Sequence, residues 1–169
     1  ANPLKPSEIS YDLYNGMPGV VLFQLELFHA TADKSWLDDA TAGANELIAQ
    51  LPTLEAAGSC GLYDGLGGAA FVLEETHRAT GDGRYRDAAT QAIAMIHRLA
   101  QSTGAGVAWA NGSAANDIIS GSAGIGLVLV WADRSFGGRE SRALAVAVGK
   151  RLVEVGQTER GATKWDVWR

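Results

Sequence analysis

Three short stretches decide the fold of this chain: Tyr14-Asn15-Gly16-Met17-Pro18-Gly19, Tyr63-Asp64-Gly65-Leu66-Gly67-Gly68 and Ile119-Ser120-Gly121-Ser122-Ala123-Gly124. In each stretch two glycines stand three residues apart. The leading glycines, Gly16, Gly65 and Gly121, follow one another at intervals of 49 and 56 residues. A repeat of this length indicates an array of similar units that stack on one another.

The residues after each glycine pair predict a helical hairpin. A mostly apolar run comes first, and we expect it to form a helix that is buried on most of its sides. A second helix follows, with apolar residues every third or fourth position on one face. In the first two units a Thr-x-Asp turn joins the helices. The expected pairs of helices are Val20–Phe28 with Trp36–Ile48, Ala69–Thr80 with Arg84–Ala100, and Ile125–Ala132 with Ser141–Val155.

The sequence therefore predicts an all-α fold of three helical hairpins, covering roughly residues 12–50, 61–101 and 117–156. Because the glycines carry no Cβ, they let neighbouring backbones approach closely where each inner helix begins. The connecting segments are less regular and include an expected extended piece, Gly106–Trp109. Three hairpins are few for such an array, so we expect residues 1–169 to form a partial α/α-toroid domain of the six- or seven-hairpin type.

Composition excludes several classes of function. The chain is 47% hydrophobic with a formal net charge of −5, and it has no dense cluster of Lys and Arg, which argues against nucleic-acid binding. No apolar run approaches the ~18 residues of a membrane span. Cys60 is the only cysteine, which fits a reducing compartment, and no signal peptide opens the chain. We therefore expect a cytoplasmic protein that contacts neither membrane nor nucleic acid.

The three motifs resemble those of the lanthionine synthetase C-like family, the cyclases of lanthipeptide biosynthesis. The segments Asp12–Phe23, Gly61–Gly68 and Asp117–Ile125 look like the family's first, second and third glycine motifs. The resemblance covers essentially the whole chain but only part of the family's domain, which is an α/α toroid of about seven hairpins. It implies an N-terminal fragment of a cyclase domain.

The resemblance also implies a chemistry. In the family, zinc held by two cysteines and a histidine activates a cysteine thiol of a precursor peptide, which adds to a dehydroamino acid. This chain has no second cysteine, and His29, His77 and His97 are not spaced like the family's ligands. We therefore expect zinc in the full-length parent, no metal ligand or cofactor-binding residue in this fragment, and no cyclisation by the fragment alone.

One catalytic position of the family is matched by Asp117, four residues before Gly121. The resemblance implies that Asp117 is an acid/base in the central cavity. The alternative is that Asp117 bonds a turn amide or caps the third inner helix. Asp12 occupies the same position in the first unit and Asp64 directly precedes Gly65, so acidic residues recur near these helix starts, where the helix dipole favours them.

Two other functions stay open from the sequence. Six-hairpin toroids also house carbohydrate-active enzymes, in which Asp64, Asp117 and Trp109 would act as carboxylates and aromatic platform. The third possibility is a peptide-binding module that has lost its metal. A partial array also leaves two apolar edges uncovered, so we expect a homodimer or aggregation rather than a monomer, and two copies would suffice to close a six-hairpin ring.

Overall fold

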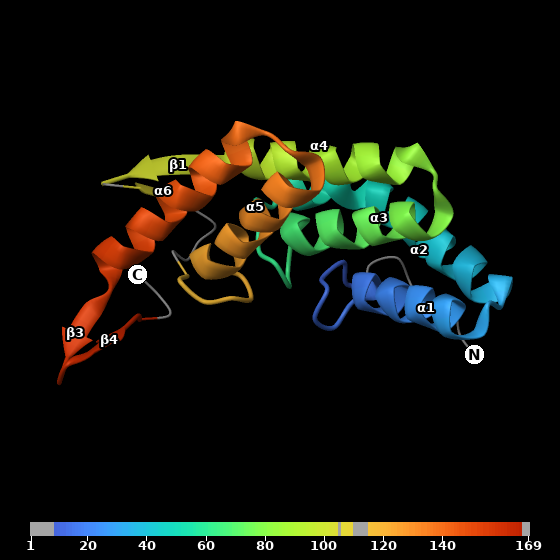
Figure 1. The fold of residues 1–169 in the computed structure, drawn as a ribbon, viewed down its shortest axis with the longest axis horizontal. Coiled ribbons are helices and arrows are strands. Elements are labelled where there is room, and N and C mark those ends of the chain that lie inside the picture. The colour runs from blue at the N-terminus through green and yellow to red at the C-terminus, as the bar shows by residue number, and fades with distance from the viewer. Residues whose placement is uncertain (1–8, 105, 110–114, 167–169) are drawn as a thin grey trace.

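The computed structural model describes residues 9–104, 106–109 and 115–166. Within them the chain forms six α-helices, which pair as three hairpins (Figure 1). These helices are α1 (Met17–Thr31), α2 (Lys34–Ala56), α3 (Leu66–Thr80), α4 (Gly83–Leu99), α5 (Ser122–Phe136) and α6 (Arg139–Val155). Besides the contacts inside each hairpin, α3 packs against α1, α2 and α5. The predicted all-α hairpin fold is confirmed.

Short strands follow the second and third hairpins. β1 (Ala100–Thr103) pairs antiparallel with β2 (Gly106–Trp109), and β3 (Gln157–Glu159) pairs antiparallel with β4 (Ala162–Lys164). The extended piece Gly106–Trp109 was predicted, but the expected helix to Ala100 is one residue too long, because Ala100 already pairs with Trp109. The Trp109 indole N–H donates to the Ile96 carbonyl oxygen at 2.8 Å and so fixes this hairpin on α4.

One backbone hydrogen bond closes the loop before each inner helix. The amide after the first glycine donates to the carbonyl oxygen seven residues earlier: Met17 to Ser10 at 2.8 Å, Leu66 to Ser59 at 2.8 Å and Ser122 to Ala115 at 2.9 Å. A Cβ on the first glycine would overlap that same carbonyl oxygen in all three loops. All three glycines have negative φ, so the close approach of the backbone requires glycine here, and a left-handed conformation does not.

The Thr-x-Asp turns are built identically in the first two hairpins. The Thr31 hydroxyl donates to the Leu27 carbonyl oxygen and accepts from the Asp33 backbone amide. The Asp33 carboxylate in turn accepts from the Ser35 backbone amide. Thr80, Asp82 and Arg84 make the same bonds in the second hairpin. Each aspartate is thus the N-cap of its outer helix. The third hairpin replaces this turn by Gly137-Gly138, both with positive φ.

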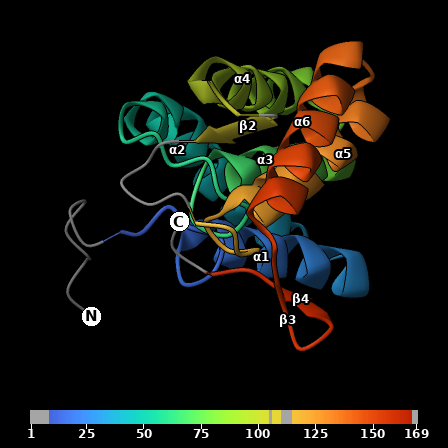
Figure 2. The ribbon, with the colours of Figure 1, turned by 90° about the vertical axis from the view of Figure 1, so that its left-hand side faces the viewer.

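The helix α3 lies in the middle of the bundle, between α4 and α1 (Figure 2), and is buried along most of its length. The expectation that all inner helices are buried on most sides is wrong for α1 and α5. Val20, Phe23 and Leu127 are exposed, because no hairpin among the described residues covers the outer side of either helix. None of the helices in the described ranges has the length and apolar character to cross a membrane.

A half-buried histidine contact joins the second hairpin to the third. His97 Nε2 on α4 lies 3.0 Å from the hydroxyl oxygen of the buried Ser141 on α6. Burial lowers the pKa of His97, although the Glu140 carboxylate, 3.6 Å from Nδ1, partly opposes the shift. Near neutral pH the imidazole is therefore neutral in the folded protein.

Replacing Gly65 by alanine is expected to destabilise the fold by at least about 2 kcal/mol, because the new Cβ would overlap the Ser59 carbonyl and neither backbone can move freely. The matched control is Gly149→Ala in the middle of α6, where a Cβ meets nothing within 4 Å and helix propensity favours alanine by up to about 1 kcal/mol. Urea denaturation of both variants measures the difference. Equal stability of the two variants would contradict this explanation of the motif.

The His97 contact is expected to make stability depend on pH. The folded-state pKa is lowered, so below about pH 6.5 the unfolded chain binds the proton more readily and stability falls as the pH drops through the folded pKa. His97→Gln removes this titration. The free energy of unfolding, measured by urea denaturation at a series of pH values, should then depend less on pH in this range. An unchanged slope in the variant would show that His97 does not carry the effect.

Candidate functional site

The three glycine-motif loops lie side by side and are joined by backbone hydrogen bonds. The amides of Leu13 and Tyr14 donate to the Tyr63 carbonyl oxygen at 2.6 and 3.2 Å, and the Tyr63 amide donates to the Ile119 carbonyl oxygen at 3.0 Å. Tyr14 and Tyr63 also contact each other edge to face. Residues that are some fifty positions apart in sequence thus share one edge of the molecule, at the amino ends of the inner helices.

Asp117 is fixed by the turn that it closes. One carboxylate oxygen accepts from the amides of Ile119 at 2.6 Å and Ser120 at 3.0 Å, and the other lies 3.4 Å from the Ser120 hydroxyl. Of the two structural interpretations left open by the sequence, the turn-amide bond is present. The helix cap is not, because α5 is capped by Gly121 without a side-chain bond. An oriented, half-buried carboxylate is compatible with a further role as a proton carrier.

The other two loops also carry a carboxylate near this position, but it comes from different places in the repeat. Asp12, four residues before Gly16, accepts from the Asn15 amide at 2.6 Å in the way that Asp117 does. The second loop has Gly61 at this position. Here the side chain of Asp64 folds back, and its Oδ1 atom occupies the space that a Cβ at residue 61 would take. Asp64 therefore restores to the second loop the carboxylate that the repeat position lacks.

The charges of Asp117 and Asp12 act electrostatically on Asp64. Partial desolvation raises the pKa of Asp64, and the negative charges of Asp117 and Asp12 raise it further, while its own backbone amide opposes the shift. Asp64 thus holds a proton more readily than an ordinary aspartate. A carboxyl that can be protonated beside a fixed carboxylate is an arrangement suited to proton transfer.

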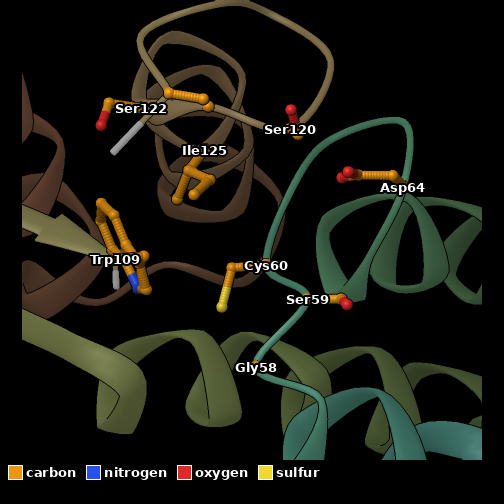
Figure 3. A pocket seen from close by; sticks show the side chains of 10 residues that line it. Gly58, Ser59, Cys60, Asp64, Trp109, Ser120, Ser122 and Ile125 are labelled. Atoms are coloured by element: carbon orange, nitrogen blue, oxygen red, sulfur yellow. The ribbon is translucent and has the colours of Figure 1, made fainter. Parts of the chain in front are cut away.

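A cavity of about 270 Å³ opens beside these loops (Figure 3). Asp64 and Ser120 line it from the motif loops, while Cys60, Trp109 and Ile125 form its apolar part. Cys60 is only 3% exposed, and burial, with smaller contributions from Asp64 and Glu55, raises the pKa of its thiol to about 12. The thiol is therefore neutral near pH 7 and a poor nucleophile.

The sequence of this chain matches the model of one protein family. The model of a family described as lanthionine synthetase C-like protein matches residues 7–167. The chain belongs to the lanthionine synthetase C-like family. Among curated proteins, no sequence matches the chain. The resemblance noted from the three glycine motifs is thereby confirmed.

A zinc site, which the family implies, does not fit the residues that the structure describes. Within those ranges no three His, Cys, Asp or Glu side chains converge on a point where a metal ion could bind. Cys60 is buried in the cavity wall, His77 contacts the Asp82 carbonyl oxygen just beyond the carboxyl end of α3, and His97 faces Ser141. The part of this lanthionine synthetase C-like chain that the structure describes thus provides carboxylates at its motif edge and no such group of three metal-binding side chains.

The role of Asp64 is the feature of the site that sequence reasoning missed. Its place directly before Gly65 was evident, but not that it fills the gap at Gly61. The signal lay in the repeat itself, because position 61 is glycine where the other two units have aspartate. The cavity at Cys60 and Trp109 gave no comparable signal, since it forms between segments that the repeat pattern does not align.

Replacing Asp117 by asparagine is expected to lower the pKa of Asp64, because one of the two neighbouring negative charges disappears. The measurement is an NMR titration of the Asp64 side-chain carboxyl carbon. Asp12→Asn should shift the pKa in the same direction. Asp87→Asn, an exposed change on α4 outside the motif loops, is the control and should leave the titration unmoved. A titration of Asp64 that is the same in all four proteins would mean that the carboxylates do not interact.

Proposed function

We propose that this chain acts within a lanthionine-forming cyclase, in which a cysteine thiol of a precursor peptide adds to a dehydroalanine or dehydrobutyrine and closes a thioether ring. The family match over residues 7–167 supports this reaction class. The observation that carries the proposal is the shared edge of the three motif loops, where Asp12, Asp64 and Asp117 are brought together.

The reaction needs a group that moves a proton. When the sulfur attacks the β-carbon, the π electrons of the double bond move onto the carbonyl side and form an enolate. The α-carbon must then gain the proton that the thiol has lost, so the addition is balanced without any further reagent. We propose that Asp117 carries this proton, because two backbone amides and a hydroxyl hold its carboxylate in a fixed orientation. Asp64 lies beside it as a second carboxyl that takes up protons readily.

Activation of the thiol lies outside this proposal for the described residues. Zinc lowers the pKa of a bound thiol in sites of the Cys2His type, but the described part of the chain has no such ligand set. We therefore assign no zinc-dependent step to these residues. We propose that the 169-residue chain alone does not cyclise a peptide, and that zinc belongs to the full-length parent.

The aromatic platform that the carbohydrate alternative requires is nearly buried. Trp109 lines the cavity but is only 6% exposed, and its indole N–H is bonded to the Ile96 carbonyl oxygen, so little of its ring face is open. An aromatic platform for a sugar needs an exposed ring face. The peptide-binding module without catalysis has no particular observation in its favour, and the experiment below distinguishes it.

Asp117→Asn in the full-length protein is expected to slow cyclisation at least tenfold, since positioned general acids and bases contribute roughly 10²–10⁴ in rate. Ring closure leaves the peptide mass unchanged, so remaining free thiols are counted by alkylation and mass spectrometry. Asp87→Asn serves as the control and should cyclise at the unaltered rate.

The outcomes separate the candidates. An Asp117→Asn protein that cyclises as fast as the unaltered protein would overturn the role of Asp117. A full-length protein that binds the dehydrated peptide but never closes a ring would favour the binding module over the cyclase.

A further inference from the structure

The junction between the second and third hairpins departs from the repeat at two positions. Twenty residues after the first glycine, the first two units have Trp36 and Tyr85, whereas the third unit has Ser141. Thirty-two residues after the first glycine, the first unit has Ile48, whereas the second unit has His97. At this junction a hydroxyl and an imidazole therefore stand where the preceding junction has an aromatic and an aliphatic side chain.

The change of residue size leaves a cavity. At the first junction Tyr85 is 2% exposed, and its hydroxyl donates to Asn45 Oδ1 of α2 at 3.2 Å. At the second junction the small Ser141 stands at this position, and a cavity of about 470 Å³ lies between α4 and the start of α6. Packing alone favours a large side chain at such a place, because an unfilled cavity costs stability. The pair at the second junction is therefore not explained by packing.

The two polar residues contact each other in the wall of this cavity. His97 Nε2 lies 3.0 Å from the Ser141 hydroxyl oxygen, and His97 Nδ1 lies 3.6 Å from a carboxylate oxygen of Glu140. All three residues line the cavity. When the ring proton is on Nδ1, toward the carboxylate, Nε2 is free to accept the proton of the hydroxyl. A serine, a base and an orienting carboxylate in this order are the groups that activate a serine for attack.

The imidazole has the protonation state that a base needs. Burial lowers the pKa of His97, and the Glu140 carboxylate only partly opposes this shift, so the ring is neutral near pH 7. Arg139 and Glu140 are the charged residues among the described ones that line the cavity. The Glu140 side chain is 90% exposed, so solvent screens its charge. We therefore assign to Glu140 the orientation of the ring.

The start of α6 provides donors for a developing negative charge. The first four amides of an α-helix have no acceptor within the helix. In α2 and α4 the carboxylates of Asp33 and Asp82 accept from one of these amides. The helix α6 begins after Gly138, which makes no side-chain cap bond and itself lines the cavity. The uncapped amides at this end are thus available to hold an oxyanion.

We propose that Ser141 and His97 form a second, hydrolytic site that cleaves esters of small acyl groups, with Glu140 as a positioning residue. The walls of the cavity include Ile93 and Phe136, which suit a short apolar acyl group. The site lies between two hairpins that are both present among the described residues. It shares no lining residue with the cavity at the motif loops, and it does not depend on the proposed cyclase reaction.

The hydrolysis takes place in two balanced steps. The Ser141 oxygen attacks the ester carbonyl carbon, and the hydroxyl proton passes to His97 Nε2. The tetrahedral intermediate then expels the alcohol, which takes this proton and leaves the acyl group on Ser141. Water attacks the acyl-serine with His97 again as the base, so that the carboxylic acid leaves and the serine hydroxyl is restored. Water is the only reagent besides the ester.

Chemical labelling tests the serine without any variant. The full-length protein is treated near neutral pH with a fluorophosphonate, which forms a phosphonate ester with an activated serine and releases fluoride. Mass spectrometry of the digested protein should locate the label on Ser141. Protein unfolded in urea before the treatment is the control and should not be labelled there. A folded protein in which Ser141 stays unlabelled would overturn the proposal.

The rate of p-nitrophenyl acetate hydrolysis tests the pair. Ser141→Ala and His97→Gln are each expected to lower this rate at least tenfold, because a positioned base contributes roughly 10²–10⁴ in rate. His77→Gln, a histidine change outside the cavity, and Ser102→Ala, an exposed change in β1, are the matched controls and should keep the unaltered rate. Circular dichroism checks that all four variants are folded. A Ser141→Ala protein that hydrolyses the ester as fast as the unaltered protein would refute the site.

The pH profile of the same reaction separates catalysis from a structural role. Only the neutral imidazole accepts a proton, so the rate should fall as the pH drops through the folded-state pKa of His97, which lies below its ordinary value of about 6.5. Glu140→Gln removes the charge that partly opposes the effect of burial on this pKa. The fall in rate should therefore move to lower pH in this variant. A fall at the same pH in both proteins would overturn the assignment of His97 as the base.

Discussion

The close approach of backbone to glycine at the three motif loops is the constraint on which the structure depends. At Gly16, Gly65 and Gly121 the chain folds back so tightly that the next amide reaches a carbonyl seven residues earlier. This bond sets the direction in which each inner helix leaves its loop. It also leaves the outer side of each loop free to bond the next, so that a local constraint produces the stacking of the hairpins.

The candidate site is a consequence of that stacking. No single loop gathers the three aspartates, because each loop holds one carboxylate at most in the position four residues before its glycine. The Tyr14–Tyr63–Ile119 series of backbone bonds brings them to one edge. There partial desolvation, and after it the negative charges of Asp117 and Asp12, raise the pKa of Asp64. The proposed function therefore depends first on the stacking of the three loops, because only this stacking brings the aspartates near one another.

Much of this architecture could be predicted from the sequence, for physical reasons that are local. The glycine pairs mark helix starts, and the Thr31–Asp33 and Thr80–Asp82 turns mark hairpin bends, because these residues act through bonds to their own neighbours. Two uncovered edges were predicted from the small number of hairpins, but not that Phe23 and Leu127 are exposed there, since that depends on how each helix is turned against its neighbours. The placement of the Asp64 carboxylate in the space beside Gly61 could not be predicted either, because it depends on the three-dimensional path of the loop between the two residues.

Amide hydrogen exchange at Tyr14 and Tyr63 tests the central claim most directly. Both amides lie in loops, where exchange is normally fast, yet the structure pairs them with the Tyr63 and Ile119 carbonyls. If the motif loops form one bonded edge, these two amides should exchange as slowly as amides in the core of α3. If both amides exchange as fast as amides of an unfolded peptide, the loops are not joined, and the carboxylate site has no framework.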